Sequence, residues 1–141
     1  MFETSHFHPM LVHFPIALIV IGFLADLVSL FVKKELCFTK LSFYLLIIGT
    51  LSALAAILSG VFFTAEMDGA AGVIQTTHEL LAFITLILLI ATSTLRIIQL
   101  KKPENNVIKW SSLLFYALAT MAVSATGFLG GSLVYNFMMP L

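Results

Sequence analysis

The sequence has little charge and only one cysteine. Charged residues make up 10% of its 141 residues, hydrophobic residues make up 60%, and the mean hydropathy is +1.09. Soluble domains have about 25% charged and 45–50% apolar residues, so this composition excludes an ordinary soluble fold and indicates a chain in a lipid bilayer. The lone Cys37 excludes an internal disulfide. A formal net charge of zero argues against a nucleic-acid partner.

Lysine and arginine are absent from residues 1–32, 41–95 and 110–141. The apolar runs are long enough for four helices, because about 20 residues cross a hydrocarbon core of roughly 30 Å. Loops on the cytoplasmic side of a membrane collect Lys and Arg. The chain is therefore expected to place both termini on the outer, periplasmic side. The basic residues form two groups, Lys33, Lys34 and Lys40, and Arg96, Lys101, Lys102 and Lys109.

These patterns predict an all-α integral membrane four-helix bundle, formed by a single transmembrane domain over residues 1–141. Pro9 suits the first turn of a helix, and Pro15 should kink that helix beside His13. The third helix should begin near Thr77, where a threonine can cap it. The expected spans are about residues 9–32, 40–64, 78–99 and 107–137.

The two halves of the chain resemble each other weakly. His13 lies 47 residues before Gly60, and His78 lies 49 residues before Gly127. Each half thus has a histidine-bearing helix followed by a helix in which a serine or threonine directly precedes the glycine. This pattern predicts a pseudo-two-fold repeat of helix hairpins. Because few positions match, chance agreement is the alternative.

His13 and His78 are the candidates for chemistry. An ionisable residue inside a span costs several kcal/mol, so it is by default a functional hypothesis. Two imidazoles that face each other across a bundle can supply both axial ligands of a b-type haem. The alternative is structural, with each histidine at the bilayer interface and hydrogen-bonded to backbone freed by Pro15 or to a neighbouring acid.

A flat macrocycle also needs helix surfaces without side chains, and glycines at the same end would provide them. The alternative role of the same glycines is close helix packing, and we favour this interpretation for them. Haem propionates usually meet Arg or Lys, which this end lacks, so Tyr135 is expected near them. The glycines are Gly60, Gly127, Gly130 and Gly131.

A transition-metal site is the competing interpretation of the same histidines. His8, His13 and His78, with nearby acids, could bind Zn or Cu. His8 and His13 lie about 140° apart around a regular helix, so both could reach one ion only if a proline bends the segment. His6 and His8 lie in or near the start of the chain, and both are expected to be solvated rather than bound to a metal.

Asp26 and Arg96 form a separate pair. Both should lie one or two turns from the basic boundary on parallel helices, where they could form a buried ion pair. A proton relay through Asp26 would need a second titratable group at mid-depth, and the spans contain none. We therefore expect a structural role.

The segment His8-Pro9-Met10-Leu11-Val12-His13-Phe14-Pro15-Ile16-Ala17-Leu18 resembles the signature of the membrane family catalogued as domain of unknown function 2231. Gly60, His78 and the run from Gly130 to Tyr135 also match, whereas Asn136 stands near where the family usually has a glycine. The resemblance implies a four-helix protein of the bacterial inner membrane. Some members of the family look joined to Rieske-type iron–sulfur domains. By analogy alone, this points to electron transfer.

The leading hypothesis is an electron-transfer membrane protein that binds one haem b through His13 and His78. Its partner would be a quinol or a periplasmic redox protein, and an oligomer is compatible with the sequence. The alternative is a non-enzymatic membrane subunit or a module that binds Zn or Cu through the same histidines. Whether the protein is an enzyme stays open at this point.

Overall fold

The computed structural model describes residues 7–32 and 36–137, which form helices joined by short connections. Helices α1 and α2 are separated only by a turn at Val12 and together make one span, His8–Phe31. Four helices are thus long and apolar enough to cross a membrane, and the predicted all-α membrane bundle is confirmed. The helices are α1 (Phe7–Leu11), α2 (His13–Phe31), α3 (Leu36–Phe63), α4 (Gly69–Lys101) and α5 (Asn106–Asn136).

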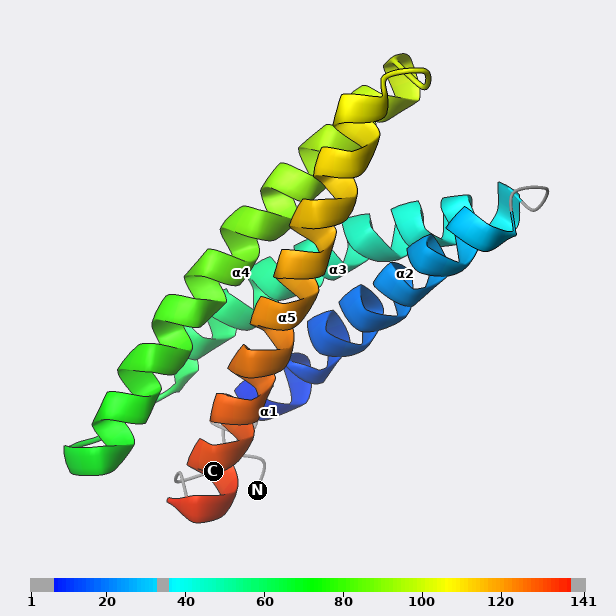
Figure 1. Ribbon diagram of the computed structural model, residues 1–141. Coiled ribbons are helices and arrows are strands. Elements are labelled where there is room, and N and C mark those ends of the chain that lie inside the picture. Colours follow the sequence, from blue (N-terminus) through cyan, green and yellow to red (C-terminus); the bar gives the residue numbers. More distant parts are fainter. Residues whose placement is uncertain (1–6, 33–35, 138–141) are drawn as a thin grey trace.

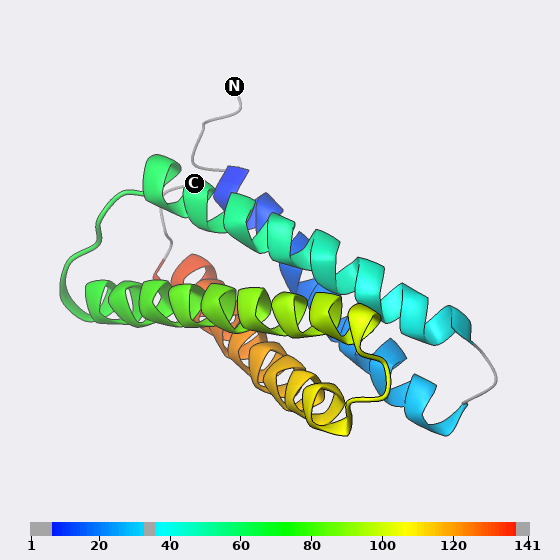
Figure 2. The ribbon, with the colours of Figure 1, turned by 90° about the horizontal axis from the view of Figure 1, so that it is seen from above.

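The helices pair into two hairpins, α2 with α3 and α4 with α5, which cross at an angle (Figure 1). One end of the molecule carries α1, the connection at residues 64–68 and the C-terminal end of α5, and we call it the histidine end. The opposite end carries the ends of α2 and α4 and the starts of α3 and α5, and we call it the basic end. Figure 2 shows the same division from above.

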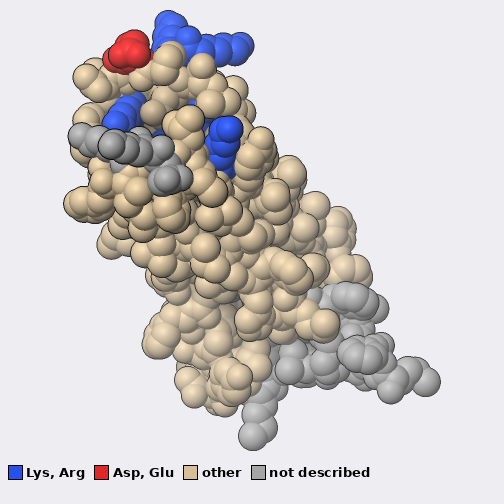
Figure 3. Space-filling model, turned by 90° about the vertical axis from the view of Figure 1, so that its right-hand side faces the viewer, with Lys and Arg blue, Asp and Glu red and all other residues tan. Residues whose placement is uncertain are grey.

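Lys and Arg side chains gather at the basic end, and most of the remaining face in Figure 3 carries no charged residue. Lys33 and Lys34 lie outside the described residues. The start of α5 is fixed there by Asn105, whose side chain accepts a hydrogen bond of 3.1 Å from the Ile108 N–H. Such a cap satisfies a helix N–H that has no partner within the helix.

The interior holds mainly small and hydroxyl-bearing residues, and the large apolar residues point outward. Leu51, Phe62 and Met121 are among the many large hydrophobic residues with more than 60% of their surface exposed. Small residues allow helices to approach closely in a bilayer, where burying apolar side chains gives no advantage over lipid. This distribution fits a bundle surrounded by lipid.

The third long helix begins earlier than predicted. It starts at Gly69, and Thr76 and Thr77 lie inside it with their hydroxyls donating to the carbonyls of Gly72 and Val73. Gly69 has a φ of +66°, a conformation that favours glycine at the entry to the helix. The expected cap at Thr76 or Thr77 is therefore wrong.

Asp26 and Arg96 form the predicted ion pair between α2 and α4. Only 4% of the Asp26 side chain and 11% of the Arg96 side chain are exposed. Arg96 also donates from Nη1 to Gln99 Oε1 at 3.2 Å. The pair connects the two hairpins near the basic end.

Several buried residues of the first hairpin have a buried counterpart 70 residues later. Ile19 and Leu89 are both fully buried, as are Leu46 and Tyr116. The helix bounds follow the same interval, because α2 ends at Phe31 and α4 ends at Lys101.

Gly22 is a position where a side chain should not fit. A Cβ there would overlap the hydroxyl of the fully buried Tyr116 and lie 3.0 Å from the Leu45 Cβ. We expect Gly22→Ala to destabilise the protein by about 1–3 kcal/mol, because overpacking forces neighbours to shift. Gly131→Ala is the control, since a Cβ there meets nothing within 4 Å and alanine favours a helix by up to about 1 kcal/mol. Unfolding of purified protein in detergent measures both, and equal stability of the two variants would contradict this packing.

Candidate functional site

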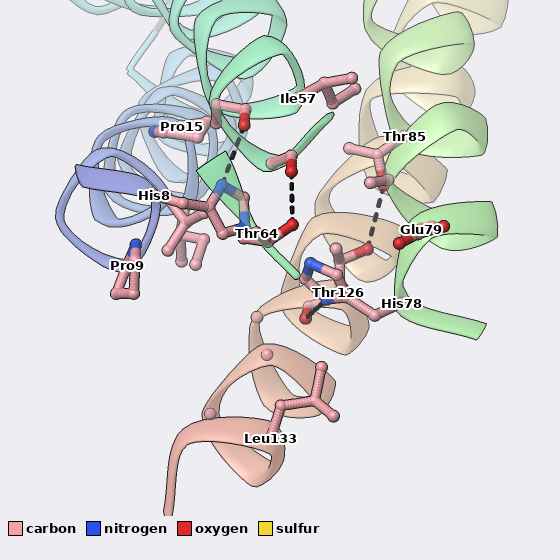
Figure 4. Close-up of a pocket in the computed structure, with 18 of the residues that line it drawn as sticks. His8, Pro9, Pro15, Ile57, Thr64, His78, Glu79, Thr85, Thr126 and Leu133 are labelled. Carbon is pink, nitrogen blue, oxygen red and sulfur yellow. Dashed lines mark hydrogen bonds between the residues drawn. The ribbon is translucent and has the colours of Figure 1, made fainter. Parts of the chain in front are cut away.

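The histidine end contains a cavity of about 550 Å³ between the two hairpins. Residues from all five helices line it, and most are apolar or glycine. His8, His13 and His78 all contribute to its walls, as Figure 4 shows for His8 and His78. A cavity of this size falls within the usual range for small-molecule and cofactor sites.

The expectation that His8 is solvated is wrong, because His8 is half-buried and is held in the cavity by α3. Its Nδ1 lies 3.0 Å from the Ala56 carbonyl oxygen and 2.9 Å from the Ser59 hydroxyl oxygen. A carbonyl oxygen only accepts, so in the neutral imidazole Nδ1 carries the hydrogen and Nε2 carries the free lone pair. The ring is thus fixed in the tautomer that can bind a metal through Nε2.

His78 is held in the same way by α5. Its Nδ1 lies 2.9 Å from the Thr126 carbonyl oxygen, so its Nε2 also carries the free lone pair. The Thr126 hydroxyl donates to the Ala122 carbonyl and lies 3.4 Å from the Thr85 hydroxyl. Metal-binding histidines almost always donate their second ring N–H in this manner.

The two imidazoles lie together. Their ring centres are 6.2 Å apart and their planes are nearly perpendicular, at 86°. Each ring rests on a glycine, since a Cβ at Gly60 would lie 3.0 Å from His8 Cε1 and a Cβ at Gly130 would lie 3.1 Å from His78 Cε1. Larger residues at Gly60 or Gly130 would displace the imidazoles.

The structure places His13 differently from His78. His13 is exposed, and its Nδ1 lies 2.6 Å from the Pro9 carbonyl oxygen, one turn earlier in the chain. His13 still lines the cavity, but the ring in contact with His78 is that of His8. His6 lies outside the described residues.

The other predicted site residues also line the cavity, in different ways. A Cβ at Gly127 would meet Ile16, so this glycine serves helix packing, whereas Gly131 faces open space. Tyr135 lines the cavity and is 86% exposed. The described lining contains the carboxylates Glu66 and Glu79 and no Lys or Arg.

The described residues include no group of three or more His, Cys, Asp or Glu placed to hold one metal ion. A divalent ion between His8 and His78 would therefore depend on water or another molecule for its remaining ligands. Structural zinc sites have four protein ligands and catalytic ones usually have three.

Comparison with protein families matches residues 4–139 to the family described as "Predicted membrane protein (DUF2231)". The chain belongs to this family. The resemblance inferred from the first motif is thus confirmed, and membership supports a place in a lipid bilayer. No curated protein and no solved structure matches the chain.

The pairing of His8 with His78 could have been found from sequence spacing. His8 lies 52 residues before Gly60, and His78 lies 52 residues before Gly130. The hydrogen bonds of the two rings also each span 48 residues, from His8 to Ala56 and from His78 to Thr126.

Proposed function

We propose that this protein is a membrane electron carrier that binds one b-type haem through His8 and His78. The observation that carries the proposal is the paired geometry of the two imidazoles. Each ring has its Nδ1 engaged by a backbone carbonyl, and the ring centres are 6.2 Å apart. This replaces His13 with His8 in the hypothesis drawn from the sequence.

The separation of the rings fits ligands on opposite sides of one metal ion. Bonds of about 2.0 Å, with about 1.1 Å more from each nitrogen to its ring centre, would place the ring centres roughly 6 Å apart. A tetrahedral ion would bring the rings closer, to roughly 5 Å. The observed 6.2 Å is compatible with one metal ion held between the two imidazoles.

The number of histidine ligands favours haem over a free Zn or Cu ion. A haem iron takes four nitrogens from its macrocycle and needs only two more ligands from the protein. His8 and His78 supply that number, and the described residues include no third His, Cys, Asp or Glu placed to share one ion with them. Transition-metal binding remains the alternative that the experiment below distinguishes.

The residues around the pair have defined roles in this proposal. The carbonyls of Ala56 and Thr126 orient the rings and increase their basicity as ligands. The apolar walls limit water around the iron, and a bound haem would supply one-electron redox chemistry. Tyr135, an exposed lining residue, would be the hydrogen-bond donor for its propionates, because the described lining contains no Lys or Arg.

The proposal includes a location and an orientation. Lys40, Lys101 and Lys102 lie at the basic end, which would face the cytoplasm of a bacterial cell by the positive-inside rule. The histidine end and both termini would then face the periplasm. The partner would be a quinol in the membrane or a periplasmic redox protein.

We also propose that the two hairpins are repeats with an interval of 70 residues. The helix bounds, the buried positions and the contacts of His8 and His78 share this interval. A pseudo-two-fold axis along the membrane normal would then relate the two imidazoles. Such an axis would pass between His8 and His78 and make the two imidazoles equivalent.

A spectrum tests the haem. Protein expressed with an ample haem supply and purified in detergent should show a sharp α-band in the reduced-minus-oxidised difference, with about one haem per chain. Elemental analysis of the same sample should find iron and little zinc or copper. A colourless preparation that contains about one zinc or copper per chain would replace this proposal with the metal-binding alternative.

A further inference from the structure

A second cavity, of about 190 Å³, lies near the basic end. Residues from α2, α3, α4 and α5 line it, so it forms where the two hairpins meet. Its walls are mostly polar, unlike those of the cavity at the histidine end. The polar and charged lining residues are Asp26, Ser29, Thr39, Arg96, Gln99 and Lys109.

This cavity carries more positive than negative charge. Among its described lining residues, Arg96 and Lys109 are cations and Asp26 is the one anion. Asp26 is paired with Arg96, so the charge of Lys109 remains to be balanced. Lys109 contacts the Trp110 ring, with its Nζ 6.0 Å from the ring centre.

Arg96 also has unused hydrogen-bonding capacity. Its two terminal nitrogens donate to Asp26 and Gln99. Its Nε is buried and has no hydrogen-bond partner among the described residues. A buried donor without a partner costs about 1–3 kcal/mol, and more for a charged group, so the site is incomplete without an acceptor.

We expect the cavity to lie at the depth of lipid head groups. Trp110, next to Lys109 in the chain, is 57% exposed, and tryptophan is enriched at the boundary between membrane and water. Lys101 and Lys102 are exposed at the same end of the molecule. Anionic groups should therefore concentrate there.

We propose that this cavity binds the phosphate group of an anionic ligand. Arg96 and Lys109 form its cationic side, and the hydroxyls of Ser29 and Thr39 line the same space. Arginine and lysine are the usual partners of phosphate, and basic pockets between membrane helices bind phosphorylated head groups. The phosphate belongs either to a phospholipid or to a free ion, and this site is independent of the histidines.

The single tryptophan provides the first measurement. Trp110 fluorescence should change saturably when the full chain in detergent is titrated with inorganic phosphate or with a short-chain phosphatidate. A short-chain phosphatidylcholine, which has no net charge, is the comparison. A response to both anions identifies a site for free phosphate as well as lipid, and a response to phosphatidate alone identifies a lipid head-group site.

Variants of Lys109 locate the binding. Lys109→Gln should weaken the binding of radiolabelled phosphate or of phosphatidate, measured by equilibrium dialysis or native mass spectrometry, by about tenfold or more. Lys109→Arg should keep it. Lys102→Gln, an equal charge change at an exposed residue of the same end, should alter it less than about twofold. No saturable binding, equal binding of phosphatidylcholine, or equal losses in Lys102→Gln and Lys109→Gln would overturn the proposal.

Discussion

His8→Ala is expected to abolish haem binding, and His78→Ala should do the same. Each change removes one of the two protein ligands, and an iron held by a single histidine loses much of the affinity that retains the cofactor. His13→Ala should keep about one haem per chain, because His13 is exposed and bonds to Pro9 rather than meeting His78. The α-band and the haem content per chain measure all three variants.

A conservative replacement separates ligand loss from misfolding. His8→Met should retain haem with a raised reduction potential, because methionine is an axial ligand that raises the potential relative to a second histidine. Each variant must also elute as a single species with an unchanged helical circular dichroism spectrum. If His13→Ala lost the haem while His8→Ala retained it, the pair inferred from sequence alone would be right and the present one wrong.

The sequence favoured His13 because the first helix was expected to begin at Pro9. With that start, His8 lay just before the first span and His13 lay about one turn inside it. The structure begins α1 at Phe7 and turns at Val12, so His8 lies within the helical segment. Hydropathy does not resolve a shift of this size, and a hydrogen bond to a carbonyl 48 residues away is not visible in local sequence.

The start of α4 was misplaced for a related reason. The stretch Gly69-Ala70-Ala71-Gly72 has two glycines and follows two acids, and this composition is typical of a loop. The buried Gln75 changes the outcome, because it accepts from the Met67 N–H at 2.8 Å and donates to the Ala65 carbonyl at 3.1 Å. These bonds, which span 8 and 10 residues, fix the connection against the helix, and helix propensity alone does not predict them.

The four spans and the ion pair were predictable because each rests on a strong and simple physical effect. Long uncharged runs must form helices in a bilayer, where every backbone polar group needs a partner. Asp26 and Arg96 are opposite charges at matching depth on parallel helices, and an unpaired charge at that depth is costly. The contact between them required no knowledge of side-chain packing.

Breaking that ion pair should produce the largest loss of stability in the chain. Asp26→Leu leaves the Arg96 guanidinium, with only 11% of its side chain exposed, without its anionic partner. Removing one member of a buried pair costs about 3–5 kcal/mol. Unfolding of the purified protein by added sodium dodecyl sulfate measures the loss, and Glu104→Leu, at an exposed acid near the same end, is the matched control.

The double variant Asp26→Leu with Arg96→Met separates two contributions to stability. One is the cost of burying an unpaired charge, and the other is the stabilisation that the ion pair itself provides. Replacing both charges with apolar side chains removes the desolvation cost, so the double variant should recover most of the stability that Asp26→Leu loses. The same double variant should lose phosphate binding, because Arg96 is the buried cation of the cavity at the basic end. It should keep the α-band, since the histidine pair contacts neither residue. A double variant no more stable than Asp26→Leu would instead show that the pair itself holds the two hairpins together.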